Sequence, residues 1–164
     1  MRRSIDYGLL TVVALLIVLH FALRPWLGSP RAAPDFLLLA LLVYAIQARP
    51  GAAAIAGFVV GILSDALTPV AFGSGMLAYT VVGYLAAWGK AIFFAENLVV
   101  MAGFFFAGTV VRDVLVLLWG GQVTGGALLW QLGVWTLLKG LTTAVVGVGA
   151  LLVFRNWLHV RLRE

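Results

Sequence analysis

Apolar runs of membrane-spanning length dominate this sequence and leave very few charges to cover a water-facing surface. Of the 164 residues, 63% are hydrophobic and only 10% are charged, whereas a soluble domain carries about 25% charged residues. Such runs need a hydrocarbon environment, so the lipid bilayer is the solvent that this chain requires. Because no polar stretch is long enough for a soluble domain, we expect residues 1–164 to form a single transmembrane domain.

Proline and glycine clusters divide the apolar sequence into helical segments. These clusters fall near residues 24–34, 49–51, 68–75 and 120–126, and Lys90 with the following Glu96-Asn97 marks one more break. Six helices are predicted between them, at residues 7–23, 36–48, 52–67, 76–89, 96–119 and 127–157. The fold class predicted from this pattern is an all-α integral membrane protein, a compact bundle of six transmembrane helices.

Two segments allow a second interpretation. The helices at 36–48 and 52–67 are short for a span and are also compatible with a re-entrant hairpin. Arg49 at the hairpin tip would then lie in the middle of the membrane, which favours full spans through a locally thinned bilayer.

The first apolar run, at residues 7–23, resembles a signal peptide. Arg24-Pro25-Trp26 follows it in place of a cleavage site, which favours an uncleaved helix.

Arginine and lysine indicate the orientation. With six spans and both termini in the cytoplasm, seven basic residues lie on the inner side and only Arg24 and Arg31 on the outer side. Positive charges prefer cytoplasmic loops. We therefore predict several spans with both termini in the cytoplasm.

The residue types of common catalytic and metal sites are scarce. The chain has no cysteine, and its two histidines, His20 and His159, are far apart, so thiolate chemistry and a histidine zinc site are not expected. No phosphate loop, nucleophile elbow or dinucleotide fingerprint is present. We predict a protein that is not an enzyme and has no cofactor. The net charge of +5 fits contact with membrane lipids better than binding of nucleic acid.

A few charged residues interrupt the apolar helices and need an explanation. Arg112 and Asp113 lie in the fifth segment and Lys139 in the sixth, at depths that permit an Asp113–Lys139 contact. We also expect Arg112 to be able to reach Asp65. One hypothesis is a polar cavity that moves ions or binds a ligand; the other, which we favour, is a neutral cluster that fixes helix register. His20 is interpreted as a polar ring near the outer headgroups rather than a ligand.

Glycines form a second pattern on the third segment. Gly57, Gly61 and Asp65 are spaced four residues apart, which places them on one helix face. Small residues let helices approach closely in lipid, so we expect packing within the chain, with a subunit interface as the alternative.

The middle of the chain resembles the rod shape-determining protein MreD family. The shared pattern is the run PDFLLLALLVY from Pro34, the Arg49-Pro50 turn, and GFVVGILSD from Gly57 to Asp65; it covers residues 34 to about 90. Through this resemblance Asp35, Gly57, Gly61, Asp65 and Gly73 are family-pattern residues. It implies that Asp35 caps or orders its helix, that the glycines permit packing, and that Asp65 anchors the end of its helix or lines a cavity.

The resemblance also implies a function and partners. It suggests a non-enzymatic scaffold of the bacterial elongation complex that binds MreC directly and supports side-wall peptidoglycan synthesis. A RodA-type glycosyltransferase, a penicillin-binding transpeptidase and MreB are the expected further members of that complex. The implied fold is similar to the substrate-binding subunits of energy-coupling factor transporters. A solute-binding subunit of a vitamin-type uptake transporter is therefore the alternative function.

Overall fold

The computed structural model describes residues 7–23, 33–67, 72–93, 98–121 and 125–158, and every element in these ranges is a helix. The predicted all-α class is therefore confirmed. The elements are α1 (Tyr7–Leu23), α2 (Phe36–Gln47), α3 (Pro50–Ala66), α4 (Ser74–Phe93), α5 (Leu98–Gly120), α6 (Gly126–Trp130), the π-helical turn η2 (Gln131–Thr136) and α7 (Leu137–Leu158). The last three follow one another directly, so they form one long helix, α6–α7, in the place of the sixth predicted segment.

The helix ends follow local chemistry and correct two predicted boundaries. Arg49 is extended, as a residue before proline prefers, and Pro50 occupies the first turn of α3. Consequently α3 begins two residues earlier than the predicted start at Ala52. The predicted end of α4 at Gly89 is wrong, because the helix continues to Phe93. One glycine costs a helix only about 1 kcal/mol, which is too little to stop an apolar helix.

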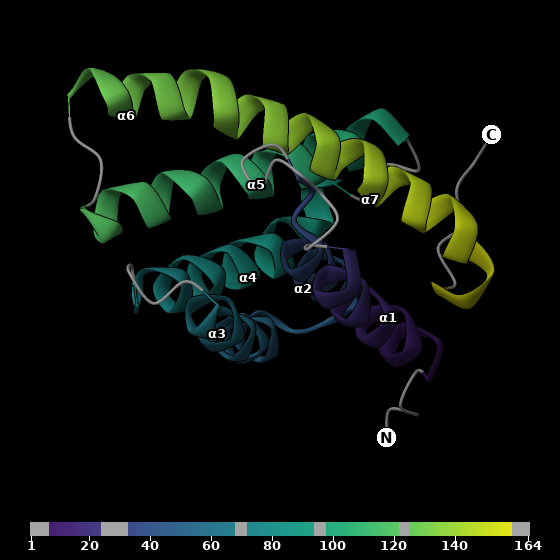
Figure 1. Cartoon of the computed structure of the whole chain (residues 1–164). Helices are drawn as coiled ribbons and strands as arrows, with labels where there is room; N and C mark the ends of the chain where they lie inside the picture. The colour runs from purple at the N-terminus through teal and green to yellow at the C-terminus, as the bar shows by residue number, and fades with distance from the viewer. Residues whose placement is uncertain (1–6, 24–32, 68–71, 94–97, 122–124, 159–164) are drawn as a thin grey trace.

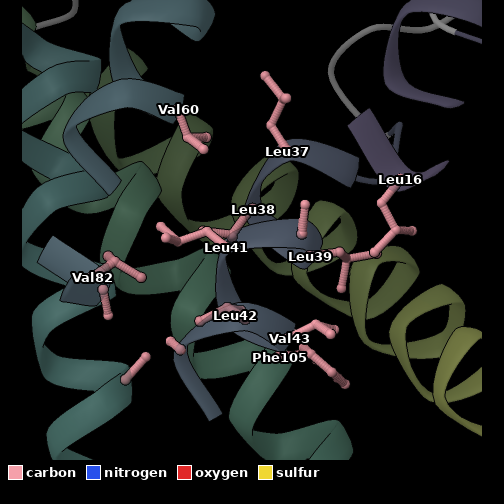
Figure 2. Packing of buried hydrophobic residues seen from close by; sticks show 14 of the residues in the cluster. Leu16, Leu37, Leu38, Leu39, Leu41, Leu42, Val43, Val60, Val82 and Phe105 are labelled. Carbon is pink, nitrogen blue, oxygen red and sulfur yellow. The ribbon is translucent and has the colours of Figure 1, made fainter. Parts of the chain in front are cut away.

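The short helix α2 lies at the centre of the bundle. Residues 36 to 43 are all buried, so every side of this helix is covered by protein. A helix that is apolar all round is suited to such a position. Figure 2 shows its leucines projecting in several directions from the helix, among side chains such as Leu16 of α1 and Phe105 of α5.

Two helix pairs surround this centre. In Figure 1, α3 lies beside α4, and α5 lies beside the long α6–α7 helix. Helix α4 also packs against α5, and α1 packs against α2. The bundle therefore has two hairpin-like layers, α3–α4 and α5–α7, which meet along α4, α5 and the central α2.

Two of the described helices are long and apolar enough to cross a membrane, at Leu98–Gly120 and Gln131–Phe154. Three shorter apolar helices accompany them, at Gly8–Leu23, Phe36–Gln47 and Pro50–Ala66. With 12 residues, α2 is about 18 Å long. Its burial means that protein surrounds this short helix along its length.

Candidate functional site

The most polar part of the described interior begins at the residue that starts α2. Asp35 is 4% exposed and caps the helix, because its Oδ1 accepts a hydrogen bond of 3.1 Å from the backbone N–H of Leu38. Its Oδ2 accepts a hydrogen bond of 2.9 Å from the hydroxyl of Tyr79 on α4. Both carboxylate oxygens thus have partners within the α2–α4 part of the bundle.

A second acid lies across from it on α5. Asp113 Oδ1 accepts a hydrogen bond of 2.6 Å from Nη1 of Arg112 and one of 3.2 Å from Nζ of Lys139 on α7. The Asp113–Lys139 contact expected from helix depth is therefore present in the structure. Arginine and aspartate at adjacent positions of one helix meet here because both side chains turn toward α7 and α2.

These groups form one network of four charges, the charge network of Asp35, Arg112, Asp113 and Lys139. Arg112 Nη2 lies 3.7 Å from Asp35 Oδ2, and Lys139 Nζ lies 3.6 Å from the same oxygen. Each cation therefore faces both acids, and the charges cancel. A buried pair that loses one partner leaves an uncompensated charge, so neutrality is the condition under which such a network is tolerated.

Tyr79 and Thr143 complete the site, and neither was predicted from the sequence. The guanidinium of Arg112 lies 4.9 Å from the ring centroid of Tyr79, a cation–π geometry. The hydroxyl of Thr143 accepts a hydrogen bond of 3.1 Å from the backbone N–H of Asp35. Asp35 was predicted to cap or order its helix, and the cap is confirmed. Its buried cationic partners were not predicted, although an acid at the start of a largely apolar helix is the signal for them.

Two buried polar atoms near this site lack a partner among the described residues: Nε of Arg112 and Oγ1 of Thr136. Thr136 ends the π-helical turn that precedes Lys139. Insertions of this kind shift the residues of a helix around its axis and are frequent at functional sites. Unsatisfied buried groups are rare in native proteins, so these two atoms distinguish this part of the described interior.

Asp65 anchors the end of α3, as the family resemblance implied, but its partners differ from the expected Arg112. Its carboxylate accepts hydrogen bonds from the backbone N–H groups of Gly73, Gly75 and Met76, at 2.8, 3.1 and 3.1 Å. The expected contact between Asp65 and Arg112 was therefore wrong, because backbone N–H groups at the start of α4 bind the Asp65 carboxylate. Asp65 ties the end of α3 to the start of α4, across a turn in which Gly73 has φ +98°. Only glycine adopts that conformation readily.

The glycines of α3 contact α4 backbone to backbone. A Cβ added at Gly57 would collide with the carbonyl oxygen of Tyr79, and one at Gly61 would lie 2.5 Å from Cα of Met76. Small residues at such contacts let two helices approach closely in lipid. The α3–α4 pair is thus fixed by main-chain contact, and Tyr79 is held where its hydroxyl meets Asp35.

His20, which was predicted as a polar ring near the outer headgroups, lies on α1. Its ring makes an edge contact with the ring of Phe21, at a centroid distance of 5.6 Å. The ion pairs of the charge network join α2, α5 and α7.

Below the charge network, α4 and α5 enclose an apolar groove of about 120 Å³ that reaches the central helix. We call it the α4–α5 groove. Its lining residues are Leu42, Val82, Leu85, Ala86, Phe104, Ala107, Gly108 and Val111. The interface between the two layers therefore combines the charge network with an apolar groove beside it.

A protein-family model described as rod shape-determining protein MreD matches residues 1–124. This range runs from α1 through α5 and includes Asp35, Arg112 and Asp113. Neither the curated proteins nor the solved structures gave a match. The expected likeness to the substrate-binding subunits of energy-coupling factor transporters, and the solute-binding function that went with it, receive no support from these comparisons.

Proposed function

Because the chain belongs to the rod shape-determining protein MreD family, we propose that it acts as a non-enzymatic scaffold of the bacterial elongation complex. Membership of this family of membrane proteins gives the chain a role in rod shape determination and an association with the rod-shape complex. The single observation that carries the proposal is the family match over residues 1–124, which spans five of its helices.

In the proposed role the chain binds MreC directly. Through MreC it joins a RodA-type glycosyltransferase, a penicillin-binding transpeptidase and MreB, and so supports peptidoglycan synthesis along the side wall. The chemistry of the described interior agrees with a binding role. Its buried acids are engaged by cations and backbone N–H groups, as in Asp35 and Asp65. A carboxylate held in this way orders helices and is poorly placed to exchange protons with a substrate.

The proposed topology is six spans in the cytoplasmic membrane with both termini inside. Its support is the distribution of arginine and lysine along the sequence. The chain has no cysteine, so single introduced thiols report topology cleanly. Gly51 and Gly126 are exposed positions with open space around them. A membrane-impermeant thiol reagent added to intact cells should label Gly126→Cys and leave Gly51→Cys unlabelled until the membrane is permeabilised; the reverse pattern contradicts the topology.

The function is tested by co-expression with MreC and affinity purification in mild detergent. We expect a stoichiometric complex that survives size-exclusion chromatography. Gly57→Leu, which separates α3 from α4, serves as the misfolded control, and Gly51→Ala serves as the matched neutral variant on the same helix. If the wild-type protein is monodisperse in detergent but never retains MreC, the result would count heavily against the scaffold function.

A cellular test complements the purification. Rod-shaped cells depleted of their own MreD should recover rod shape when the wild-type chain or Gly51→Ala is expressed with its MreC. They should stay round with Gly57→Leu. Recovery of rod shape without any MreC association would separate the shape role from the proposed direct contact.

A further inference from the structure

Within the charge network, the side-chain bonds on each side of the interface between the layers are shorter than the ion pairs that cross it. Asp35 is hydrogen-bonded to Tyr79 and Leu38 on its own side, and Asp113 is hydrogen-bonded to Arg112 and Lys139 on the other. The ion pairs that join the two sides measure 3.6 and 3.7 Å, beyond the range of a good hydrogen bond. Separating the layers would therefore leave each charge with its closest partners.

The two sides of the charge network carry opposite net charge. On α5 and α7, Arg112 and Lys139 exceed Asp113 by one positive charge, and Asp35 supplies the single negative charge on the α2–α4 side. The charged groups therefore attract one another across the interface by Coulomb forces. The Asp35–Thr143 hydrogen bond, the stacking of Arg112 on Tyr79 and the apolar packing of Leu42 beside Gly108 join the same two layers. Coulomb attraction acts at a distance and is weakened when water enters.

Three further features distinguish this interface from the one between α3 and α4. Beside the network, α4 and α5 border the α4–α5 groove, whereas α3 and α4 meet backbone to backbone. The side chains of Arg112 and Lys139 are 14% and 15% exposed, so the described residues do not cover them completely. Nε of Arg112 has no hydrogen-bond partner among the described protein groups.

We propose that the charge network is a latch, and that the α5–α7 layer separates from α2–α4 at this end of the bundle when Asp35 is released from Arg112 and Lys139. At the other end the chain continues from Phe93 of α4 to Leu98 of α5 with only four intervening residues, so the layers stay together there. The latch gives the protein two shapes that a binding partner can select between. This inference is independent of which partner is bound.

The test measures distances between spin labels on the full-length chain in lipid nanodiscs. One label pair, at Leu77 on α4 and Leu118 on α5, spans the latch; a second, at Ile55 on α3 and Leu77 on α4, lies within one layer. All three positions are exposed, and the chain has no native cysteine. The latch is opened by Asp35→Asn, because asparagine keeps a good helix cap and hydrogen-bond acceptor but removes the charge.

We expect Asp35→Asn to add a population at longer distance for the pair across the latch and to leave the α3–α4 pair unchanged. Tyr79→Phe is the matched control, since it removes a hydrogen bond to Asp35 while both ion pairs across the interface remain, and it should keep the wild-type distribution. If Asp35→Asn does not yield folded protein, Lys139→Met provides the same readout. An unchanged distance across the latch, or equal broadening of both pairs, overturns the proposal.

Discussion

Helix α4 is joined to its two neighbours by opposite means. Toward α3 the contact is made by main chain, with Gly57 and Gly61 allowing the two backbones to touch. Toward α5 the contact is made by side chains, with Tyr79 under Arg112 at one level and the α4–α5 groove at the next. One interface is therefore defined by steric fit and the other by electrostatics.

The difference shows how a chain with few polar residues can fix its helices in lipid. Between helices in a bilayer there is no hydrophobic drive, so close packing of small residues holds α3 to α4. A charge network fixes register as well, because only one alignment brings both cations to both acids. It does not require close packing around it, so a groove is tolerated beside it.

The largest effect is expected from removing Asp113, which accepts hydrogen bonds from both cations. Asp113→Ala leaves Arg112 and Lys139 with one acid between them and should cost about 3–5 kcal/mol in the free energy of unfolding. Unfolding by titration with a denaturing detergent measures it. Adding Lys139→Ala to the same chain restores neutrality and should recover part of the loss. Strictly additive losses would show that the two residues are not coupled.

The steric interface is tested by a single methyl group. Gly57→Ala places a Cβ against the backbone of Tyr79, which has no rotamer to escape into, and should cost about 1–3 kcal/mol. Gly51→Ala on the same helix is the control, since its Cβ meets nothing within 4 Å. The midpoint of thermal unfolding in detergent compares the two variants. Equal midpoints would show that α3 and α4 are not held by backbone contact.

The steric interface was the easier of the two to predict from sequence. Gly57, Gly61 and Asp65 repeat at helical spacing, so their common face is visible without a structure. The partners of that face were not visible, because Asp65 binds backbone N–H groups at 73, 75 and 76, and backbone groups have no sequence signature. This is why the prediction that Arg112 reaches Asp65 failed.

The charge network was predicted only in part. Helix depth brought Asp113 and Lys139 to the same level, because rise per residue is constant along a helix. Depth does not say which helices are neighbours, and the central position of α2 depends on how all the helices pack. Asp35 was therefore understood as a cap, and its place between Arg112 and Lys139 appeared only in three dimensions. The membrane topology stays a prediction.

A moderate effect is expected where a neutral hydrogen bond crosses between the layers. Thr143→Val keeps the size of the side chain but removes the acceptor of the Asp35 backbone N–H, which should cost about 1 kcal/mol. Thr109→Val is the control, because the Thr109 hydroxyl bonds only the carbonyl of Phe105 one turn back in its own helix among the contacts described. A denaturing-detergent titration of both variants measures the difference. If the two losses are the same, the bond to Asp35 contributes nothing specific.

The smallest effect is expected from the same methyl group placed at the electrostatic interface. At Gly108 an added Cβ would lie 2.8 Å from Cδ1 of Leu42, the end of a flexible side chain that borders the α4–α5 groove. Leu42 can turn into that space, so Gly108→Ala should change the free energy of unfolding by less than about 1 kcal/mol. Gly57→Ala, measured beside it, adds the same atoms against a backbone. If both substitutions lower the free energy of unfolding equally, the groove does not let Leu42 move aside, and the two interfaces are packed alike. If only Gly57→Ala lowers it, α4 packs rigidly against α3 and adaptably against α5.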